Sequence, residues 1–311
     1  MFSGGDTVKT IYNLPTYNKD KRLSLFDIYK SYSEINKNYW IKNILNISKI
    51  KYEKKEFSYF INTFRTKKKG KALWLIAGIH GEEPAGPNAI SKNIEYINKL
   101  GKKIPIVLLP LCNPIGYMKN WRYPYSKTIQ KDKEPKSVGD SEHCLIDLKD
   151  TRKPRRNNPI LKESELITKF VLKQVKDYPP LLVLDLHEDD SVSDSYIFSQ
   201  GFLRHKDPIA KEIIKLLRKR KFRIKKFGFT SFKQKIVNGI VTNVKDDSID
   251  ELLSTYRLII NKSIKKGPQG KSVVVVETNS KKIKLKKRVT AHSYIIKNLL
   301  KYYNITKKIK S

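Results

Sequence analysis

Short apolar runs alternate with amphipathic stretches along most of the chain. Runs of this length predict buried strands, and apolar residues recurring every three or four positions predict helices. The predicted strands cover residues 57–64, 72–77, 104–111, 181–186, 196–199 and 272–276. The predicted helices cover residues 24–33, 33–45, 90–100 and 163–175, and further helices begin at Pro208, after Ser248 and near Thr290. This order is typical of an α/β domain.

The segments that connect the predicted strands indicate which strands pair. A strand, a helix and a strand in succession predict a right-handed crossover, so residues 72–77 and 104–111 should pair in parallel. The turn at residues 67–70 predicts a hairpin between the strands at 57–64 and 72–77. The helix after Ser248 is expected to continue through Tyr256. Residues 1–50 are expected to form an N-terminal extension packed on a main domain of residues 51–311.

Composition narrows the class of protein. The 311 residues carry a formal charge of +35, yet only 12 of the 65 basic residues are Arg. Arg supplies the bidentate contacts of nucleic-acid recognition, so lysines spread along the chain argue against a dedicated nucleic-acid function. We expect no specific nucleic-acid partner, only weak salt-sensitive attraction to polyanions.

The spacing of the cysteines bears on the type of metal site, and the length of the apolar runs bears on the cellular location. Cys112 and Cys144 show no C-x-x-C spacing, which argues against a thiolate zinc site. The first ten residues lack the apolar core of a signal peptide, and no apolar run approaches the roughly 20 residues of a membrane span. We therefore expect a soluble cytoplasmic protein.

Ligand-type residues follow three of the predicted strands. His80 and Glu83 follow the strand at 72–77, His187 follows a second strand, and Glu277 follows four valines. Ligands gather at the carboxyl ends of strands in open α/β sheets, so these side chains should lie close together. Two His and one Glu leave an open position on a catalytic zinc ion, and Glu277 can exchange protons with the bound water. We predict one zinc ion per chain.

The order of the motifs resembles the M14 zinc carboxypeptidase superfamily, which includes succinylglutamate desuccinylase and aspartoacylase. The motifs are H-x-x-E at His80 and Glu83, N-P-x-G at 113–116, W-R at Trp121 and Arg122, a strand ending in His187, and a strand ending in Glu277 and Thr278. The resemblance implies a mixed, largely parallel twisted sheet with helices on both faces. It also implies zinc bound by His80, Glu83 and His187, with Glu277 as general base and Arg122 polarising the scissile carbonyl.

The chain departs from the superfamily where D-x-N-R is expected. Asp140 would keep the role of orienting the first zinc-binding His, but Glu142 and His143 replace the Asn and Arg that hold a terminal carboxylate. A loop arginine could supply this contact, or the substrate lacks a free carboxylate. The substrate-binding candidates are Asn113, His143, Arg152, Arg155, Arg156 and Tyr256. His205 and His292 belong to no motif and are expected on the surface.

These observations predict a zinc-dependent hydrolase of amide bonds, first of all a carboxypeptidase that removes a C-terminal amino acid. One alternative is an amidase or a deacylase of N-acyl amino acids. The other is a catalytically inactive basic protein that binds polyanions. The expected partner is a peptide or acyl-amino-acid substrate, and the sequence does not determine the oligomeric state.

Overall fold

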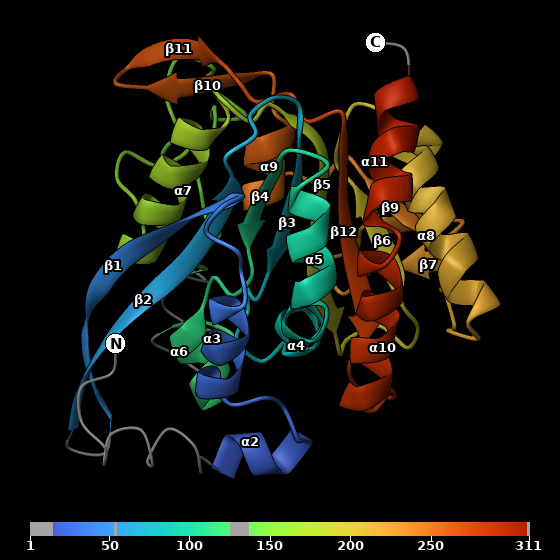
Figure 1. Ribbon diagram of the computed structural model, residues 1–311. Coiled ribbons are helices and arrows are strands. Elements are labelled where there is room, and N and C mark those ends of the chain that lie inside the picture. The colour runs from blue at the N-terminus through green and yellow to red at the C-terminus, as the bar shows by residue number, and fades with distance from the viewer. Residues whose placement is uncertain (1–14, 53–54, 125–136, 310–311) are drawn as a thin grey trace.

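The structure is a computed structural model and describes residues 15–52, 55–124 and 137–309. Within these residues, ten strands form one sheet in the order β1-β2-β4-β3-β5-β12-β6-β9-β8-β7 (Figure 1). The pairs in the centre, β4-β3-β5-β12, are parallel, while the pairs toward both edges are mostly antiparallel. The prediction of a mixed, largely parallel α/β sheet is confirmed.

The strands of this sheet are β1 (Trp40–Tyr52), β2 (Lys55–Thr66), β3 (Ala72–Ala77), β4 (Ile106–Leu109), β5 (Pro180–Asp189), β6 (Tyr196–Ser199), β7 (Phe227–Phe229), β8 (Lys235–Val237), β9 (Ile240–Thr242) and β12 (Ser272–Asn279). β10 (Arg257–Ile260) and β11 (Ser263–Lys266) form a separate two-stranded ribbon.

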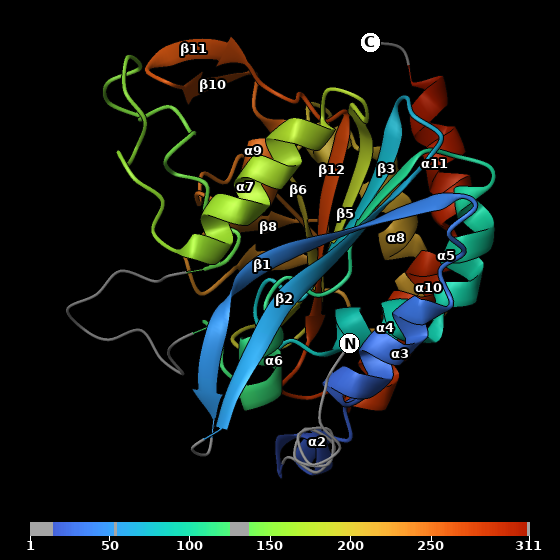
Figure 2. The ribbon, with the colours of Figure 1, turned by 60° about the vertical axis from the view of Figure 1, so that its left-hand side comes forward.

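Helices cover both faces of the sheet (Figure 2). Along β3, Leu73 and Leu75 belong to one core cluster while Trp74 and Ile76 belong to the other, because successive side chains of a strand point to opposite faces. The helices are α2 (Pro15–Asp20), α3 (Leu25–Ser33), α4 (Ala85–Lys92), α5 (Ile94–Gly101), α6 (Pro114–Lys119), α7 (Lys162–Gln174), α8 (Pro208–Lys219), α9 (Ile249–Ser254), α10 (Leu285–Ile296), α11 (Leu299–Lys308) and the 3₁₀ turn η1 (Arg204–Lys206). α7 and α9 cover one face, and α4, α8, α10 and α11 cover the other.

Two predictions about the N-terminal third are wrong. Residues 33–45 do not form a helix, because from Trp40 onward the chain pairs with β2 as the edge strand β1. The hairpin between β2 and β3 does not form either. β3 pairs with β4 and β5, so both of its edges are occupied, and β4 separates it from β2. The predicted boundary at residue 50 falls inside β1, and α3 packs into the main core through Ile28.

Two helices also differ from their predicted extent. The single helix expected over residues 90–100 is two helices, α4 and α5, which meet at Asn93. The Asn93 side chain donates hydrogen bonds to Ala89 O and to Ser293 Oγ of α10, so it ties this junction to a neighbouring helix. α9 begins at its Ser248 cap as predicted but ends at Ser254, so Tyr256 is not helical. None of the helices that the structure describes is long and apolar enough to cross a membrane.

Candidate metal centre

The predicted ligands lie together at the carboxyl ends of the central strands. His80 and Glu83 occupy the turn after β3, and His187 lies near the end of β5. Glu277 of β12 is directly opposite His187 in the parallel register. Because adjacent strands are about 4.8 Å apart, these two side chains project side by side from the same face of the sheet.

Glycines allow the turn after β3 to pack closely against the next motif. Gly78 has a φ of +66°, a conformation that glycine adopts without strain. A Cβ on Gly81 would lie 2.0 Å from the carbonyl carbon of Gly116, so the H-x-x-E and N-P-x-G segments are in backbone contact. Asn113 caps α6 by accepting from Gly116 N, and its Nδ2 donates to Arg122 O.

Glu83 stands between the two histidines. His80 Nδ1 is 2.7 Å from Glu83 Oε1, and His187 Nδ1 is 2.9 Å from Glu83 Oε2. One ligand atom from each residue lies within 4.8 Å of the others. Two imidazole nitrogens and a carboxylate oxygen are a donor set that zinc prefers, and the residues present therefore fit this ion.

The Asp185 carboxylate contacts the second ring nitrogen of His187. Its Oδ2 is 3.1 Å from His187 Nε2, and the Asp185 side chain is fully buried. A carboxylate on the second ring nitrogen fixes the imidazole so that Nδ1 faces Glu83. The sequence analysis missed this residue. The available signal was an aspartate two positions before His187, on the same face of an otherwise apolar strand.

A second buried network supports Glu83 from the other face of the sheet. Glu188 N donates to Glu83 Oε2 over 3.1 Å. The Glu188 carboxylate accepts from Ala85 N at the start of α4 and pairs with Arg288 of α10. This network links β5 to two helices and limits the positions that Glu83 can adopt.

Burial and neighbouring charges set the protonation of the centre. Burial and the Arg122 guanidinium lower the pKa of His80 to about 4, so this ring is neutral and free to bind a cation. Burial alone would raise the pKa of Glu83, but the two imidazoles outweigh it and hold that pKa well below its usual range. Burial also opposes protonation of His187, yet Asp185 and Glu83 raise its pKa.

Glu277 lies buried on the strand next to His187. Its side chain is buried, and Oε2 has no hydrogen-bond partner. Burial raises the pKa of Glu277 well above the usual value, with Glu83 and Asp189 adding to the effect and His187 opposing it. Positive charge placed beside this carboxyl group would favour the ionised form that accepts protons.

Arg122 lies at the edge of the same site. Its Nη1 is 2.8 Å from Glu82 Oε1 and 3.0 Å from Glu83 Oε1, while about a third of the side chain remains exposed. Burial raises the pKa of Glu82 to about 7, although Arg122 opposes the shift. The guanidinium therefore contacts the carboxylate of Glu83 and is partly accessible to solvent.

The other substrate candidates lie around a neighbouring loop. Asp140 accepts from Ser137 N, and in the described contacts it reaches neither histidine, so geometry gives no support to its predicted orienting role. Burial raises the pKa of Asp140 to about 8. His143 Nδ1 is buried without a partner. Arg156 Nε is 3.7 Å from Glu142 Oε1, so this arginine faces the residue that replaces the expected Asn.

The remaining two loop arginines are also engaged. Arg155 Nη2 is 2.7 Å from Glu251 Oε1, and its Nη1 contacts Asp247, with little of the side chain exposed. Arg152 pairs with Asp150 and is almost fully exposed. In these positions neither guanidinium contacts a residue of the metal centre.

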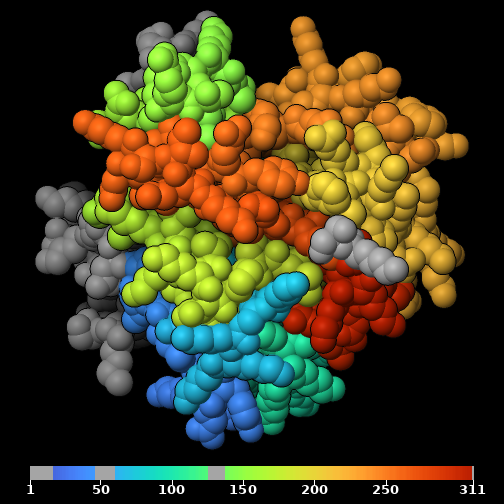
Figure 3. All heavy atoms as spheres, turned by 90° about the horizontal axis from the view of Figure 1, so that it is seen from above, coloured from blue at the N-terminus to red at the C-terminus, as the bar shows by residue number. Residues whose placement is uncertain are grey.

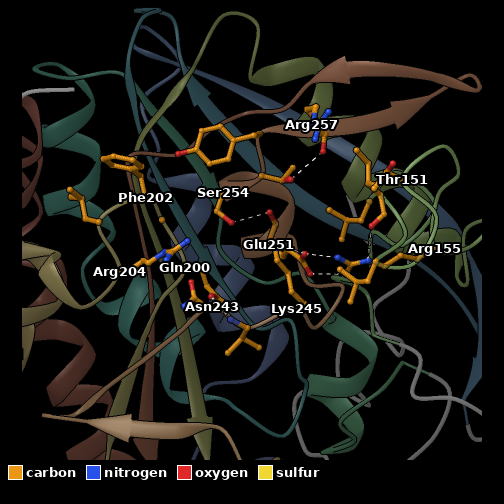
Figure 4. Close-up of a pocket in the computed structure, with 18 of the residues that line it drawn as sticks. Thr151, Arg155, Gln200, Phe202, Arg204, Asn243, Lys245, Glu251, Ser254 and Arg257 are labelled. Carbon is orange, nitrogen blue, oxygen red and sulfur yellow. Dashed lines mark hydrogen bonds and ion pairs between the residues drawn. The ribbon is translucent and has the colours of Figure 1, made fainter.

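Tyr256 and Arg155 line a pocket of about 1030 Å³ at the opposite, amino ends of the strands (Figure 4). Gln200 in this pocket donates its N–H to Val273 O, four residues before Glu277 along β12. Four residues of strand span roughly 13 Å, so the pocket and the metal centre are separate sites. Tyr256 is 55% exposed and lies there, away from His80 and His187.

The two histidines outside the motifs have different environments. His205 is exposed, as predicted. The surface prediction for His292 is wrong, because α10 places it in the core with Nε2 3.2 Å from Thr278 Oγ1. Burial and the nearby Arg288 lower the pKa of His292 to about 3, so it is a neutral core residue. The helical spacing of His292 with Arg288 and Ile295 could have indicated an inward face.

Comparison with known proteins identifies the fold. No family model matches the sequence, and a search of characterised proteins finds no significant sequence match. Among solved structures, a candidate metallopeptidase from Shewanella baltica superposes with a TM-score of 0.65 at 18% identity and covers 90% of each chain. Bovine thrombin-activatable fibrinolysis inhibitor, solved with a tick carboxypeptidase inhibitor, gives 0.59 at 15% identity, over 94% of this chain and 99% of that one.

A metallo-carboxypeptidase from Burkholderia cenocepacia gives a TM-score of 0.57 at 10% identity, over 92% of this chain and 70% of its own. These matches span nearly the whole chain, and at such low identity they define its fold. The chain shares the α/β fold of these metallopeptidase and metallo-carboxypeptidase structures.

Proposed function

We propose that this chain is a zinc-dependent hydrolase of amide bonds. One observation carries the proposal: His80, Glu83 and His187 converge at the strand ends beside Glu277, whose buried carboxyl oxygen has no partner. Other described residues, among them His143, also have a buried polar atom without a partner, but this one lies beside three ligand-type side chains and calls for an explanation. A catalytic proton acceptor next to a metal site explains this one.

Each residue then has a defined task. His80, Glu83 and His187 hold the ion, while Asp185 and Glu188 keep two of these side chains in place. Bound zinc supplies Lewis acidity, which lowers the pKa of a water molecule and polarises a carbonyl. Glu277 accepts the proton of the attacking water and delivers it to the nitrogen of the leaving amine.

Arg122 serves the carbonyl oxygen of the substrate. Its guanidinium lies at the edge of the centre with donors available, and a fixed cation there stabilises the negative charge that develops on that oxygen. Asn113 acts through the backbone of Arg122, because its Nδ2 holds Arg122 O. Asn113 is therefore a positioning residue in this proposal rather than a substrate ligand.

The identity of the scissile amide separates two candidates. A carboxypeptidase, the activity named for several fold neighbours, must bind a terminal carboxylate with a cation. The three loop arginines are engaged or far from the centre, and Glu142 would repel a carboxylate. These contacts favour the second candidate in its amidase form, because an N-acyl amino acid also carries a free carboxylate.

Matched substrates decide between them. We would measure kcat and KM for a peptide and for the same peptide with a C-terminal amide, together with an N-acyl amino acid. A carboxypeptidase cleaves only the free acid, whereas comparable cleavage of both peptides indicates no carboxylate contact. The Glu277→Gln protein, purified in parallel, corrects for contaminating peptidases. Absence of zinc and of turnover would instead favour the inactive polyanion-binding alternative.

A further inference from the structure

The hairpin of β7 and β8 forms the edge of the sheet remote from β1 (Figure 1). Three phenylalanines of this hairpin are exposed to solvent. Phe227, Phe229 and Phe232 are 58%, 61% and 76% exposed. Phe227 and Phe229 are two residues apart on β7 and therefore share one face of the strand. Exposed apolar residues scattered singly are ordinary, but three within one hairpin form a patch.

The hairpin presents these rings from an ordered turn. Thr230 N donates to Gln234 O over 2.9 Å, and Gln234 N donates to Thr230 Oγ1 over 3.2 Å. On the inner side, Ile236 is only 1% exposed and packs in a small core with Tyr196. The hairpin is therefore amphipathic, with one side fixed in the protein and the phenyl rings directed outward.

The sequence around the patch is basic, although Arg223 is paired with Asp194 over 3.0 Å. No Asp or Glu occurs from residue 219 to residue 235. Lys226 Nζ lies 5.5 Å from the centre of the Phe227 ring, so the cation and the apolar surface are contiguous. The basic residues of this segment are Lys219, Arg220, Lys221, Arg223, Lys225, Lys226, Lys233 and Lys235.

We propose that the phenylalanine hairpin, residues 225–237, docks on a membrane surface that contains anionic lipids. Phenyl rings enter the boundary between head groups and acyl chains, while lysine side chains reach the negatively charged head groups. Both attractions are needed, because a short apolar patch or a few lysines alone gives weak binding. The protein would lie on the bilayer through this edge of the sheet.

The shape and chemistry of the hairpin favour lipid over two other occupants. Single-stranded nucleic acid binds in grooves where bases stack in succession, whereas these phenyl groups carry no polar atom and lie at the edge strand of the sheet. A second copy could add to β7 as a neighbouring strand. Pairing of two such hairpins would bring their lysine clusters together, and like charges directly opposite each other are destabilising.

Vesicle sedimentation of the full chain tests the proposal. We expect binding to vesicles of phosphatidylcholine with 30% phosphatidylserine, chosen to be clearly anionic, and little binding to pure phosphatidylcholine. Phe232→Ser should lower the partition coefficient between vesicles and water by at least about tenfold, because the variant lacks a phenyl ring that would move from water into the bilayer. The matched control is Phe202→Ser. It removes a ring that is 64% exposed in the pocket of about 1030 Å³ and should change vesicle binding by less than about twofold.

Charge is tested separately from insertion. Lys225→Gln/Lys226→Gln should weaken binding to anionic vesicles by about tenfold or more, since each lysine near such a surface contributes. The control Lys265→Gln/Lys266→Gln removes two exposed lysines of β11 and should have little effect. A Phe232→Trp protein should show a blue-shifted Trp emission with anionic vesicles, reporting entry of the ring into an apolar environment.

Several results would overturn the proposal. These are absence of binding to anionic vesicles, equal losses in the hairpin variants and their controls, and no emission shift from Phe232→Trp. Light scattering that shows a dimer abolished by Phe232→Ser would assign the patch to a second copy. Tighter binding of a single-stranded oligonucleotide than of vesicles, lost in the same variants, would assign it to nucleic acid. Circular dichroism must show that each variant remains folded.

Discussion

The two ends of the central strands differ in how their charges are paired. At the amino ends, a pocket of about 1030 Å³ contains Arg155 bound to Glu251, so its buried charges satisfy one another (Figure 4). At the carboxyl ends, His80, Glu83 and His187 crowd together, and Glu277 keeps an unpaired buried oxygen. Figure 3 looks onto the amino-end side of the molecule, where the β10–β11 ribbon lies at the surface.

This difference teaches that size alone does not identify an active site. A large pocket with satisfied ion pairs is a stable part of the fold. At the other end, Glu277 Oε2 is buried without a hydrogen-bond partner beside three ligand-type side chains, an energetic cost that binding or catalysis would offset. Substitutions at the two ends should therefore separate loss of activity from loss of stability.

The largest expected effect is at Glu277. Glu277→Gln keeps the shape of the side chain but removes its ability to accept a proton, so kcat should fall by about 10²- to 10⁴-fold. The bound metal and the melting temperature should stay close to those of the native protein. Steady-state kinetics with a cleavable amide would measure the loss, and near-native turnover would mean that another group is the base.

Arg122 should give the next largest effect. Arg122→Ala removes a donor to the developing oxyanion and should lower kcat by about 10²-fold. Arg122→Lys is the matched variant, because it retains the charge but loses the second donor of the fork. A change confined to KM, with kcat intact, would show that Arg122 binds the ground state of the substrate instead.

A substitution of Arg155 tests whether the amino ends of the strands contribute to stability rather than to activity. Arg155→Ala removes the bidentate partner of Glu251, which keeps Lys245 and two backbone N–H groups, and should reduce the free energy of unfolding by about 2 kcal/mol. Metal content and the kcat of the folded enzyme should not change. Arg152→Ala, at an exposed residue of the same loop, should leave the melting temperature unchanged. Loss of activity without loss of stability in Arg155→Ala would show that the two ends are coupled.

A further prediction concerns the pH dependence of stability at Asp140, whose pKa is raised to about 8 by burial. The unfolded carboxyl group ionises near pH 4, so the native state holds its proton longer and loses stability as the pH rises from about 4 to 8. Asp140→Asn should reduce this loss, which melting curves across that range would measure. Metal affinity should be unchanged, and a 10- to 100-fold drop would restore the predicted role of orienting a histidine.

Local patterns predicted that the residues of the candidate metal centre lie together but did not predict all of their supports. His80, His187 and Glu277 follow largely apolar strands, with Asp185 as the charged exception, and parallel strand ends meet at one edge of a sheet, so their proximity could be predicted. Asp185 was missed because an aspartate inside a buried strand gains its meaning only from the residue that faces it. The role of Glu188 could not be predicted either, because its partner Arg288 lies a hundred residues later in the chain.

The errors in the fold have a related cause. Strand pairing is decided by which edges remain available, and the turn at residues 67–70 contains no information about β4, which takes the place expected for β2. Residues 40–45 become a strand because β2 offers an edge along their length. The Ser248 cap set the start of α9 correctly, but its end depends on the ribbon of β10 and β11 that follows.

The most direct test of the account is the zinc content of the purified full chain, measured by mass spectrometry beside three variants. We predict about one zinc per native chain, about one in Glu277→Gln, and loss of the metal in His187→Ala together with a lower melting temperature. Arg155→Ala should retain the metal. Native protein without zinc after reconstitution with the ion, or equal zinc in native and His187→Ala protein, would contradict the assignment of the metal centre.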